Sequence, residues 1–283
     1  MVHLWANPGF GGADPHRSAH GSGPSFGGVQ TTIKREPAEP PDQPPILVVH
    51  GAWPGAWCWE PYFLDWFADR GYLSVALDLR GHGSGSTRGA SIGHYVRDVA
   101  DVARSLPSRP IVVGHSMGGL VVQKYLEGHG APAGVLLAPS PTSGAWMTTA
   151  RVARFDPVSF AKVNVEMRLG PIVENRETAR GLLFRDDDDR PEVEEWLDAL
   201  CDESYLAYMG MLFDLPKPAR CSAPMLVVAG EADRIFSVAQ EEATAKAHDA
   251  ELVVIPGGSH DLMLDPDWET AAQSIATFLD RVL

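Results

Sequence analysis

The pentapeptide GHSMG at 114–118 decides how this chain is expected to fold. It follows the β-branched run IVV at 111–113 and leads into a helix-compatible apolar stretch at 119–126. A serine in such a strand–turn–helix connection adopts a strained backbone, and glycines two residues to either side let strand and helix approach closely. A GxSxG pattern alone is common in a glycine-rich chain, but in this setting it predicts a nucleophile elbow carrying Ser116.

A nucleophilic serine needs a base and an orienting carboxylate. In folds built around such an elbow, these residues follow along the chain in the order serine, aspartate, histidine. Asp233 follows the apolar run at 224–229, and His260 follows the run at 252–255 and a glycine-containing turn. Both lie past the carboxyl ends of predicted buried strands, where catalytic groups collect. Glu231 is a rival carboxylate, and Asp233 has the alternative role of capping a helix. We predict Ser116, Asp233 and His260 as the catalytic residues.

The run ILVV at 46–49 ends in HGAW at 50–53, a glycine-containing turn able to present a backbone N–H to a developing oxyanion. We predict the amides of Ala52 and Met117 as the two oxyanion-hole donors. The histidines at 50, 82 and 115 lie inside turn motifs, where we expect them to shape the backbone rather than to take part in chemistry.

Two tryptophans near these motifs are candidates for substrate binding. Trp53 follows the predicted oxyanion turn, and Trp146 lies near the start of the long segment described next. Large aromatic rings line many small-molecule pockets, but they equally often pack helices onto a sheet. We predict that both residues bind substrate.

Strand and helix patterns alternate on either side of one long interruption. Strands are expected at 46–49, 73–78, 111–113, 133–138, 224–229 and 252–255, and helices at 57–69, 91–105, 117–127, 237–247 and 268–282. This alternation predicts an α/β fold with a mostly parallel, doubly wound sheet. The interruption is mostly helical and too long for an ordinary connection, so we predict an inserted helical cap.

The predicted organisation has four parts: a flexible Gly/Pro-rich extension at 1–45, a first core segment at 46–140, the cap at 141–216, and a second core segment at 217–283. The composition of the extension buries little apolar surface. Within it, only 29–34 has the pattern of a short edge strand.

Charge and cysteine content narrow the function classes. Acidic residues outnumber basic ones 37 to 23, giving a formal charge of −14, so nucleic acid is not an expected partner. Three scattered cysteines are too few for a disulfide framework and favour a cytoplasmic location. No segment resembles a secretory signal or a membrane span. The four aspartates at 186–189 are expected to form a solvated loop rather than a metal site. The sequence does not predict an oligomeric state.

Five motifs in this order resemble the α/β-hydrolase superfamily: HGAW at 50–53, DLRGHG at 78–83, GHSMGG at 114–119, GEAD at 230–233 and GGSH at 257–260. The resemblance runs from about residue 46 to the end of the sequence. It implies an α/β-hydrolase fold in which Ser116 attacks an acyl carbonyl, His260 takes its proton and Asp233 orients the imidazole. Such a site requires no cofactor and no metal.

The segment 50–59 looks most similar to the group of plant methylesterases and hydroxynitrile lyases, together with related bacterial carboxylesterases. Lyase members of that group carry a threonine after the strand histidine and a lysine after the catalytic histidine. This chain has Gly51 and Asp261 there, which favours ester hydrolysis.

Several other functions stay open at this point. Thioester, lactone, amide and carbon–carbon bond hydrolysis use the same catalytic groups. Dehalogenation and epoxide opening are disfavoured, because enzymes of that kind resemble this scheme but carry a carboxylate in place of Ser116. A ligand receptor without catalysis is the alternative of a different class. The apolar composition of the cap favours a small hydrophobic substrate.

Overall fold

The structure, a computed structural model, describes residues 32–83 and 85–283, so expectations for 1–31 lie outside the described residues. Within these ranges one sheet of seven strands has the order β1-β3-β2-β4-β5-β6-β7. The strands are β1 (Thr32–Arg35), β2 (Ile46–Val49), β3 (Ser74–Leu77), β4 (Ile111–His115), β5 (Gly134–Leu137), β6 (Met225–Gly230) and β7 (Glu251–Ile255). Neighbouring strands run parallel except β1, which pairs antiparallel with β3. The predicted mostly parallel α/β sheet is confirmed.

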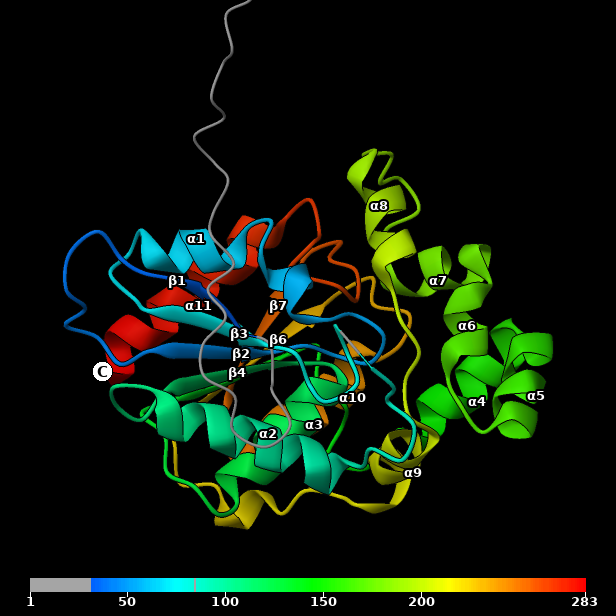
Figure 1. Ribbon diagram of the computed structural model, residues 1–283, viewed down its shortest axis with the longest axis horizontal. Helices are drawn as coiled ribbons and strands as arrows, with labels where there is room; N and C mark the ends of the chain where they lie inside the picture. The colour runs from blue at the N-terminus through cyan, green and yellow to red at the C-terminus, as the bar shows by residue number, and fades with distance from the viewer. Residues whose placement is uncertain (1–31, 84) are drawn as a thin grey trace, which may run out of the picture.

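Helices cover both faces of the sheet (Figure 1). The core helices are α1 (Phe63–Ala68), α2 (Ile92–Ser105), α3 (Met117–Leu126), α10 (Val238–His248) and α11 (Trp268–Val282). α1 and α11 lie on one face, and α2, α3 and α10 on the other. Because both faces are covered, β2 reads as the continuous apolar run ILVV, fully buried, instead of alternating with polar residues.

The helix expected at 57–69 is shorter than predicted. The chain forms a 3₁₀ turn at Ala56–Trp59 and begins α1 only at Phe63. Pro61 lies between them and has no backbone N–H to donate to a preceding carbonyl, so one continuous helix is disfavoured.

The sheet begins earlier than the predicted core boundary at residue 46. β1 lies inside the segment expected to be a flexible extension and pairs with β3, with Thr32 opposite Leu77. Arg35 at its end contacts Asp65 at 2.8 Å and Glu60 at 3.1 Å. The described part of the extension therefore includes an edge strand of the core, at nearly the position where the sequence indicated one.

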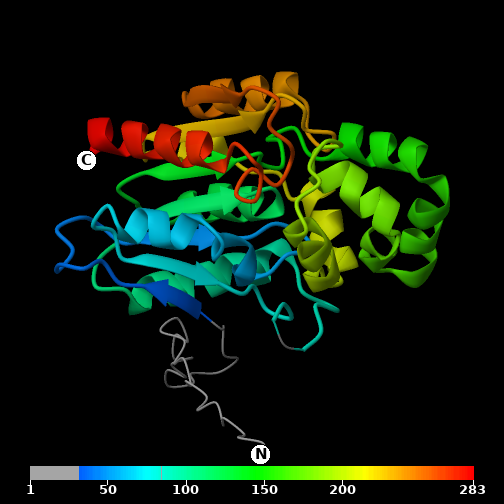
Figure 2. The same cartoon turned by 90° about the horizontal axis from the view of Figure 1, so that it is seen from above.

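Six helices separate β5 from β6: α4 (Trp146–Phe155), α5 (Pro157–Glu166), α6 (Gly170–Glu174), α7 (Arg176–Leu183), α8 (Glu192–Ala199) and α9 (Tyr205–Phe213). They form a lobe at one end of the molecule, beyond the carboxyl ends of the parallel strands (Figures 1 and 2). We refer to residues 141–216 as the cap. None of the helices in the described ranges is long and apolar enough to cross a membrane.

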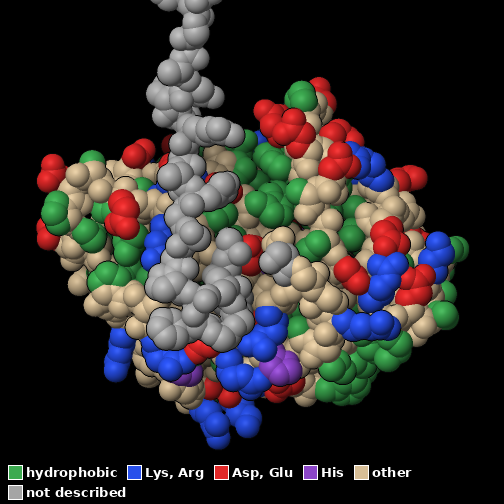
Figure 3. All heavy atoms as spheres, in the orientation of Figure 1, with side chains coloured by type: hydrophobic (Ala, Val, Ile, Leu, Met, Phe, Trp, Pro, Cys, Tyr) green, Lys and Arg blue, Asp and Glu red, His purple; other side chains and the backbone are tan. Residues whose placement is uncertain are grey.

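The outer surface of the cap carries most of the large hydrophobic side chains that are exposed in the described residues. Apart from Leu283, the large hydrophobic side chains exposed in the described residues all belong to the cap, and they are Trp146, Met147, Phe155, Val158, Val165, Met167, Leu206, Phe213 and Leu215. Figure 3 shows a group of hydrophobic side chains over α9. Since these side chains point outward, the apolar composition of the cap says less about the substrate than the sequence suggested.

Candidate active site

Ser116 stands at the turn between β4 and α3 with a backbone that non-glycine residues rarely adopt, φ 53° and ψ −120°. Glycines on both sides make this turn possible. A Cβ added at Gly114 would collide with the Gly118 carbonyl, and one added at Gly118 would collide with the backbone of β2 and His50. The serine is therefore held in a strained conformation at the carboxyl edge of the sheet, as predicted for a nucleophile elbow.

His260 and Asp233 reach Ser116 from the loops after β7 and β6. His260 Nε2 lies 3.0 Å from Ser116 Oγ, and His260 Nδ1 lies 2.8 Å from Asp233 Oδ2. The other oxygen of Asp233 accepts the backbone N–H groups of Ile235 and Phe236 at 2.7 and 3.0 Å. These bonds aim Oδ2 at the imidazole. The structure thus brings the three predicted catalytic side chains into one hydrogen-bonded line.

The loop that carries His260 is fixed by a buried carboxylate. Asp265 Oδ2 accepts hydrogen bonds from the backbone N–H of Ser259 at 2.8 Å and from its hydroxyl at 2.5 Å. The two site loops are also joined directly, because the Ala232 N–H donates to the Gly258 carbonyl at 2.9 Å. His260 is therefore presented by a loop with little freedom to move.

Charge around His260 favours its protonated form despite burial. Burial lowers the pKa of His260, but the carboxylates of Asp233 and Asp261 raise it more, and the net pKa lies above its ordinary value. His115 lies 4.8 Å away, ring to ring. Burial and the neighbouring His260 hold the pKa of His115 well below its ordinary value, so His115 stays neutral.

The segment 50–53, which we call the oxyanion turn, packs directly against the nucleophile. A Cβ added at Gly51 would lie 2.9 Å from Ser116 Cβ. Among the described residues, the Ala52 N–H has no hydrogen-bond acceptor. Met117 is the first residue of α3, and its N–H has no acceptor within the helix. Both predicted donors are therefore free to bind an oxyanion.

Trp53 joins the cap to the core beside this turn. It has a positive φ of 76° and is 9% exposed. Its indole N–H donates to the Leu169 carbonyl at 3.4 Å, and its own carbonyl accepts the Cys201 N–H at 2.9 Å. These contacts give Trp53 a structural role, and its predicted contact with substrate stays a prediction.

Trp146 lies on the outer surface of the cap and is 50% exposed. Its indole N–H donates to the Leu212 carbonyl at 3.1 Å, and its ring packs edge-on against Phe213 at 4.9 Å. Both partners belong to α9, and within the described ranges Trp146 has no recorded contact with the side chains of Ser116, Asp233 or His260. Its assignment to substrate binding has no support from this packing.

Two residues beside the site were not singled out as candidates from the sequence. Phe236 packs edge-on against His260, with ring centroids 5.5 Å apart. Glu203 of the cap is fully buried and contacts His82 of the motif at 78–83. Phe236 follows Asp233 closely enough to have been suspected, whereas Glu203 stands in an ordinary polar stretch that carries no signal.

Two groups of side chains were considered as metal ligands. In the loop 186–189, Asp186, Asp187 and Asp188 form ion pairs with Arg234, Arg185 and Arg190 respectively, which compensates their charge. His115, His260 and Asp261 bring ligand atoms within 4.8 Å of one another. Because both ring nitrogens of His260 already contact Asp233 and Ser116, this second group is not a free ligand set.

Residues 46–272 match the family model described as "Alpha/beta hydrolase family". This chain therefore belongs to the alpha/beta hydrolase family, and the resemblance drawn from the five motifs is confirmed. The relatives that it matches are named as enzymes.

Three of the matched relatives show how varied the activities are for which these proteins are named. The monoacylglycerol lipase of Mycolicibacterium smegmatis is 29% identical over 233 residues, 75% of this chain and 80% of the lipase. The non-heme chloroperoxidase of Burkholderia pyrrocinia is 38% identical over 99 residues, 34% of this chain and 35% of that protein. Putative methylesterase 11 of Arabidopsis thaliana is 34% identical over 87 residues, 29% of this chain and 22% of that protein. The match thus spans only about a third of the chloroperoxidase and less of the methylesterase.

Solved structures share the fold. A thermophilic esterase from Thermogutta terrifontis has a TM-score of 0.70 at 22% identity, covering 89% of this chain and 93% of the esterase. The monoacylglycerol lipase of Paleococcus ferrophilus has a TM-score of 0.64 at 20% identity, covering 90% of this chain and 100% of the lipase. These similarities establish the architecture, while the chemistry must be argued from the site.

Proposed function

We propose that this protein is a serine hydrolase that cleaves a carboxylic ester of a small hydrophobic substrate through an acyl-enzyme. The observation that carries this proposal is the unbroken line from Asp233 Oδ2 through both nitrogens of His260 to Ser116 Oγ, with contacts of 2.8 and 3.0 Å. With the ring proton on Nδ1 donated to Asp233, His260 Nε2 keeps a lone pair that accepts the serine hydroxyl.

In the acylation step, Ser116 Oγ attacks the ester carbonyl carbon while its proton passes to His260 Nε2. The carbonyl oxygen becomes an oxyanion that the N–H groups of Ala52 and Met117 stabilise. Collapse of the tetrahedral intermediate expels the alcohol, which takes the proton from His260. Asp233 stabilises the imidazolium between these two transfers.

In the deacylation step, a water molecule gives its proton to His260 Nε2 and attacks the acyl carbonyl. The second tetrahedral intermediate expels Ser116, which recovers the proton, and the carboxylic acid leaves. Each proton taken by His260 is returned, so the enzyme is unchanged. These steps draw on the side chains and amides already described and need no cofactor.

Two positions favour hydrolysis over the lyase reaction. A Cβ at Gly51 would lie 2.9 Å from both Ser116 Cβ and His115 Nδ1, so a threonine would not fit this backbone without displacing its neighbours. Asp261 follows His260 and is buried, placing a carboxyl where the similar lyases carry a lysine. Thioester, lactone, amide and carbon–carbon bond hydrolysis remain alternatives on the same groups.

A hydrophobic acyl substrate is supported by two observations. The aromatic ring of Phe236 packs edge-on against the ring of His260, with centroids 5.5 Å apart, so an apolar side chain adjoins the proposed base. The monoacylglycerol lipase relative aligns over 75% of this chain. We also retain the cytoplasmic location in this proposal, supported by three free cysteines at 58, 201 and 221.

The experiment is an activity series on p-nitrophenyl esters of rising acyl length, comparing the unchanged protein with Ser116→Ala, together with the intact mass after treatment with a fluorophosphonate. We expect turnover and a single mass adduct that both vanish in Ser116→Ala. The preferred acyl length would then report the size of the pocket. A folded protein that is neither labelled nor active would refute the proposal and favour a ligand receptor.

A further inference from the structure

The motif DLRGHG at 78–83 has no part in the proposed reaction, yet it lies against the oxyanion turn. His82 is buried, and its ring packs on the ring of His50 with centroids 4.5 Å apart. His82 Nδ1 faces the Leu79 carbonyl at 3.3 Å. The motif therefore contacts the first residue of the turn directly.

His50 in turn fixes the peptide that carries the proposed donor. The Leu79 N–H donates to His50 Nε2 at 3.0 Å, which leaves the ring proton on Nδ1, and Nδ1 donates to the Gly51 carbonyl at 2.8 Å. Burial and the nearby His82 hold the pKa of His50 well below its ordinary value, so this ring is neutral. The Gly51 carbonyl and the Ala52 N–H belong to one planar peptide, so holding the carbonyl sets the direction of the N–H.

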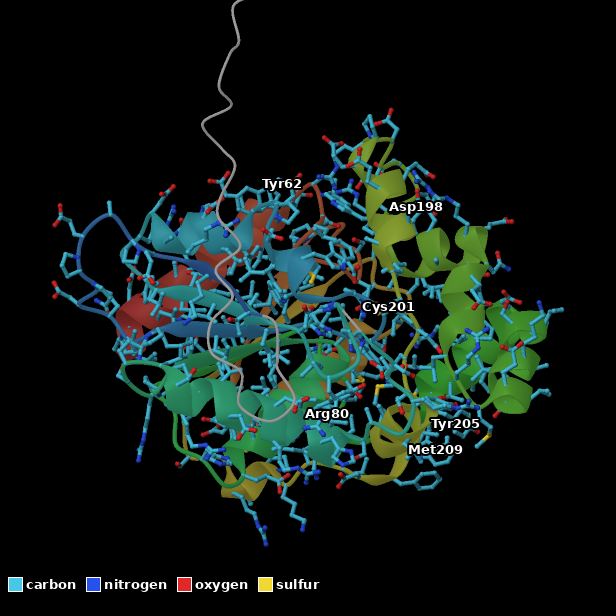
Figure 4. The ribbon with its side chains drawn as sticks, in the orientation of Figure 1. Tyr62, Arg80, Asp198, Cys201, Tyr205 and Met209 are labelled. Carbon is cyan, nitrogen blue, oxygen red and sulfur yellow. The ribbon has the colours of Figure 1, made fainter. Side chains whose placement is uncertain are left out.

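The cap holds the other end of the turn. Residues 201–204, which we call the cap strap, run between the cap and the core, and Figure 4 shows Cys201 at that junction. Both the N–H and the thiol of Cys201 contact the Trp53 carbonyl, at 2.9 and 3.1 Å. The oxyanion turn is thus held by contacts with the motif at 78–83 at one end and with the cap strap at the other.

The buried carboxylate of Glu203 connects the cap strap with the motif at 78–83. Glu203 Oε2 lies 3.2 Å from His82 Nε2, and both side chains are 0% exposed. The alignment is that of an ion pair rather than of a well-formed hydrogen bond. Glu203 Oε1 accepts the Tyr95 hydroxyl of α2 at 2.6 Å. Ser204 adds a hydrogen bond from its hydroxyl to the Ala90 carbonyl at 2.6 Å.

We infer that Glu203 and His82 are positioning residues, whose ion pair clamps the cap strap to the core and so keeps the Ala52 N–H aimed at the oxyanion. The inference rests on the proposed function, because it assigns work to the proposed oxyanion hole. Neither residue touches substrate. Their effect reaches the reaction through His50 on one side and through Cys201 and Trp53 on the other.

Electrostatics agree with a charged pair at this place. Burial lowers the pKa of His82, but Glu203 and Cys201 raise it more, to about 10. A buried charge of either sign without its partner is costly, so removing one member should disturb the local structure rather than leave it unchanged. The pair is therefore able to hold the strap at neutral pH.

The test compares Glu203→Gln with Arg190→Met. Glu203→Gln keeps the size of the side chain and an acceptor for Tyr95 but removes the charge that faces His82. Arg190→Met cuts a different tie between cap and core, in which Arg190 contacts the Leu264 carbonyl at 2.6 Å and the Tyr62 hydroxyl at 3.2 Å. Each variant is assayed for kcat and KM on the best p-nitrophenyl ester, for its rate of phosphonylation, and for its Tm.

We expect Glu203→Gln to lower kcat and the phosphonylation rate about tenfold to a hundredfold with KM within about twofold, because losing an oxyanion donor outright costs about 10²–10³ in kcat. Arg190→Met should lower the Tm but leave kcat unchanged. The inference fails if folded Glu203→Gln keeps its kcat, or if Arg190→Met loses as much. Activity that survives Ser116→Ala would instead refute the proposed function itself.

A measurement on the unchanged protein covers the case in which Glu203→Gln does not fold. Charged or titratable groups facing His82 are Glu203, Cys201, His50, Asp78 and Tyr95. Loss of the His82 proton near pH 10 should break the ion pair with Glu203 and release the cap strap. The kcat, after subtraction of the rate measured with Ser116→Ala, should therefore fall reversibly in this pH range. Cys201→Ser should keep this alkaline decline. A kcat that stays level to pH 11 would overturn the inference.

Discussion

Two of the buried histidine–carboxylate pairs in the described residues, His260 with Asp233 and His82 with Glu203, differ in what the second ring nitrogen of the histidine meets. In the pair of His260 and Asp233, that nitrogen faces the hydroxyl of Ser116 at 3.0 Å. In the pair of His82 and Glu203, it faces the carbonyl of Leu79 at 3.3 Å. A hydroxyl has a proton to give, whereas a carbonyl only accepts one. The third partner, more than the pair itself, therefore decides whether a buried histidine can act as a base.

The two pairs also differ in what they join. His260 and Asp233 lie on neighbouring loops of the core, which are joined by the hydrogen bond from the Ala232 N–H to the Gly258 carbonyl. His82 and Glu203 connect the core to the cap. Both members of the first pair belong to the core, although cap residues contact the loops that carry them: the Asp261 N–H donates to the Leu183 carbonyl at 3.1 Å, and the Thr148 hydroxyl to the Ile235 carbonyl at 2.8 Å. In the second pair, one of the two side chains belongs to the cap itself. This contrast predicts different responses to the same kind of substitution.

The largest difference is expected when each histidine loses its ring. His260→Gln should lower kcat on a p-nitrophenyl ester by at least about 10⁴-fold, because both proton transfers lose their carrier. His82→Gln should lower kcat only about tenfold to a hundredfold. Steady-state kinetics with the folded variants would measure both. Equal losses in the two variants would contradict the distinction between base and positioning residue.

The carboxylate of the first pair comes next. Asp233→Asn should lower kcat about 10³- to 10⁴-fold, since an amide can stabilise the wrong imidazole tautomer and cannot support the imidazolium. Glu231→Gln is the matched control, because Glu231 is the nearby rival carboxylate and is exposed, bonded to the Gly257 N–H at 2.9 Å. It should keep kcat within about twofold. A large loss in Glu231→Gln would reassign the orienting role.

The pH dependence of activity sharpens the comparison further. On the proposed mechanism His260 acts as a base only when neutral, so kcat/KM should fall as the pH drops through its pKa. Burial lowers the pKa of His260 but the carboxylates of Asp233 and Asp261 raise it more, so the midpoint of this acidic decline should lie above the ordinary value of about 6.5. In Asp233→Asn the residual activity should have its midpoint at lower pH. A midpoint below the ordinary value of about 6.5 in the unchanged protein would contradict this interpretation.

The smallest effect concerns Asp261, a buried carboxyl without a matching partner. Neither of its oxygens has a hydrogen-bond partner in the described residues, and His115 Nε2 lies 3.5 Å away. Burial raises the pKa of Asp261 to about 7, against the lowering effect of His260. A folded-state pKa above the unfolded one favours the protonated form, so stability is lost as the pH rises from about 4 to about 7.

Asp261→Asn should therefore raise the Tm by about 5 °C at pH 8, where the carboxyl of the unchanged protein is ionised, and by much less at pH 4. Scanning calorimetry at both pH values measures the difference. Asp280→Asn on the exposed face of α11 is the control and should leave the Tm nearly constant. An equal change at both pH values would show that the charge is not the cause.

The sequence pointed to the three side chains that the structure brings together because each follows a local pattern. Ser116, Asp233 and His260 all come within a few residues of the end of an apolar strand-forming run, and parallel strands bring their carboxyl ends to one edge. Local patterns were weaker at β1, whose residues TIKR are polar enough to resemble an extension. Its place in the sheet depends on pairing with β3, which no short stretch of sequence encodes.

Glu203 could not be predicted in the same way. Its two side-chain partners are remote in the chain, with Tyr95 being 108 residues away. In the sequence, Glu203 follows another acidic residue and has the pattern of an exposed polar stretch. It is fully buried only because the cap packs against the core. Trp146 is the opposite case. Its aromatic ring suggested a pocket residue, but the ring packs on α9 at the outer surface of the cap and is half exposed.

The wide spacing of the site residues has a consequence for how the protein folds. The Ser116–His260 contact joins positions 144 residues apart, and β5 pairs with β6 across the whole cap. Long-range parallel pairing is slow to form. On the proposed mechanism, recovery of esterase activity during refolding thus reports completion of the entire sheet. Trp59 packs on Phe63 of α1, and Trp66 packs on Phe67 within α1, both in the first half of the core. In a variant that keeps only these two of the eight tryptophans, fluorescence should recover earlier than activity.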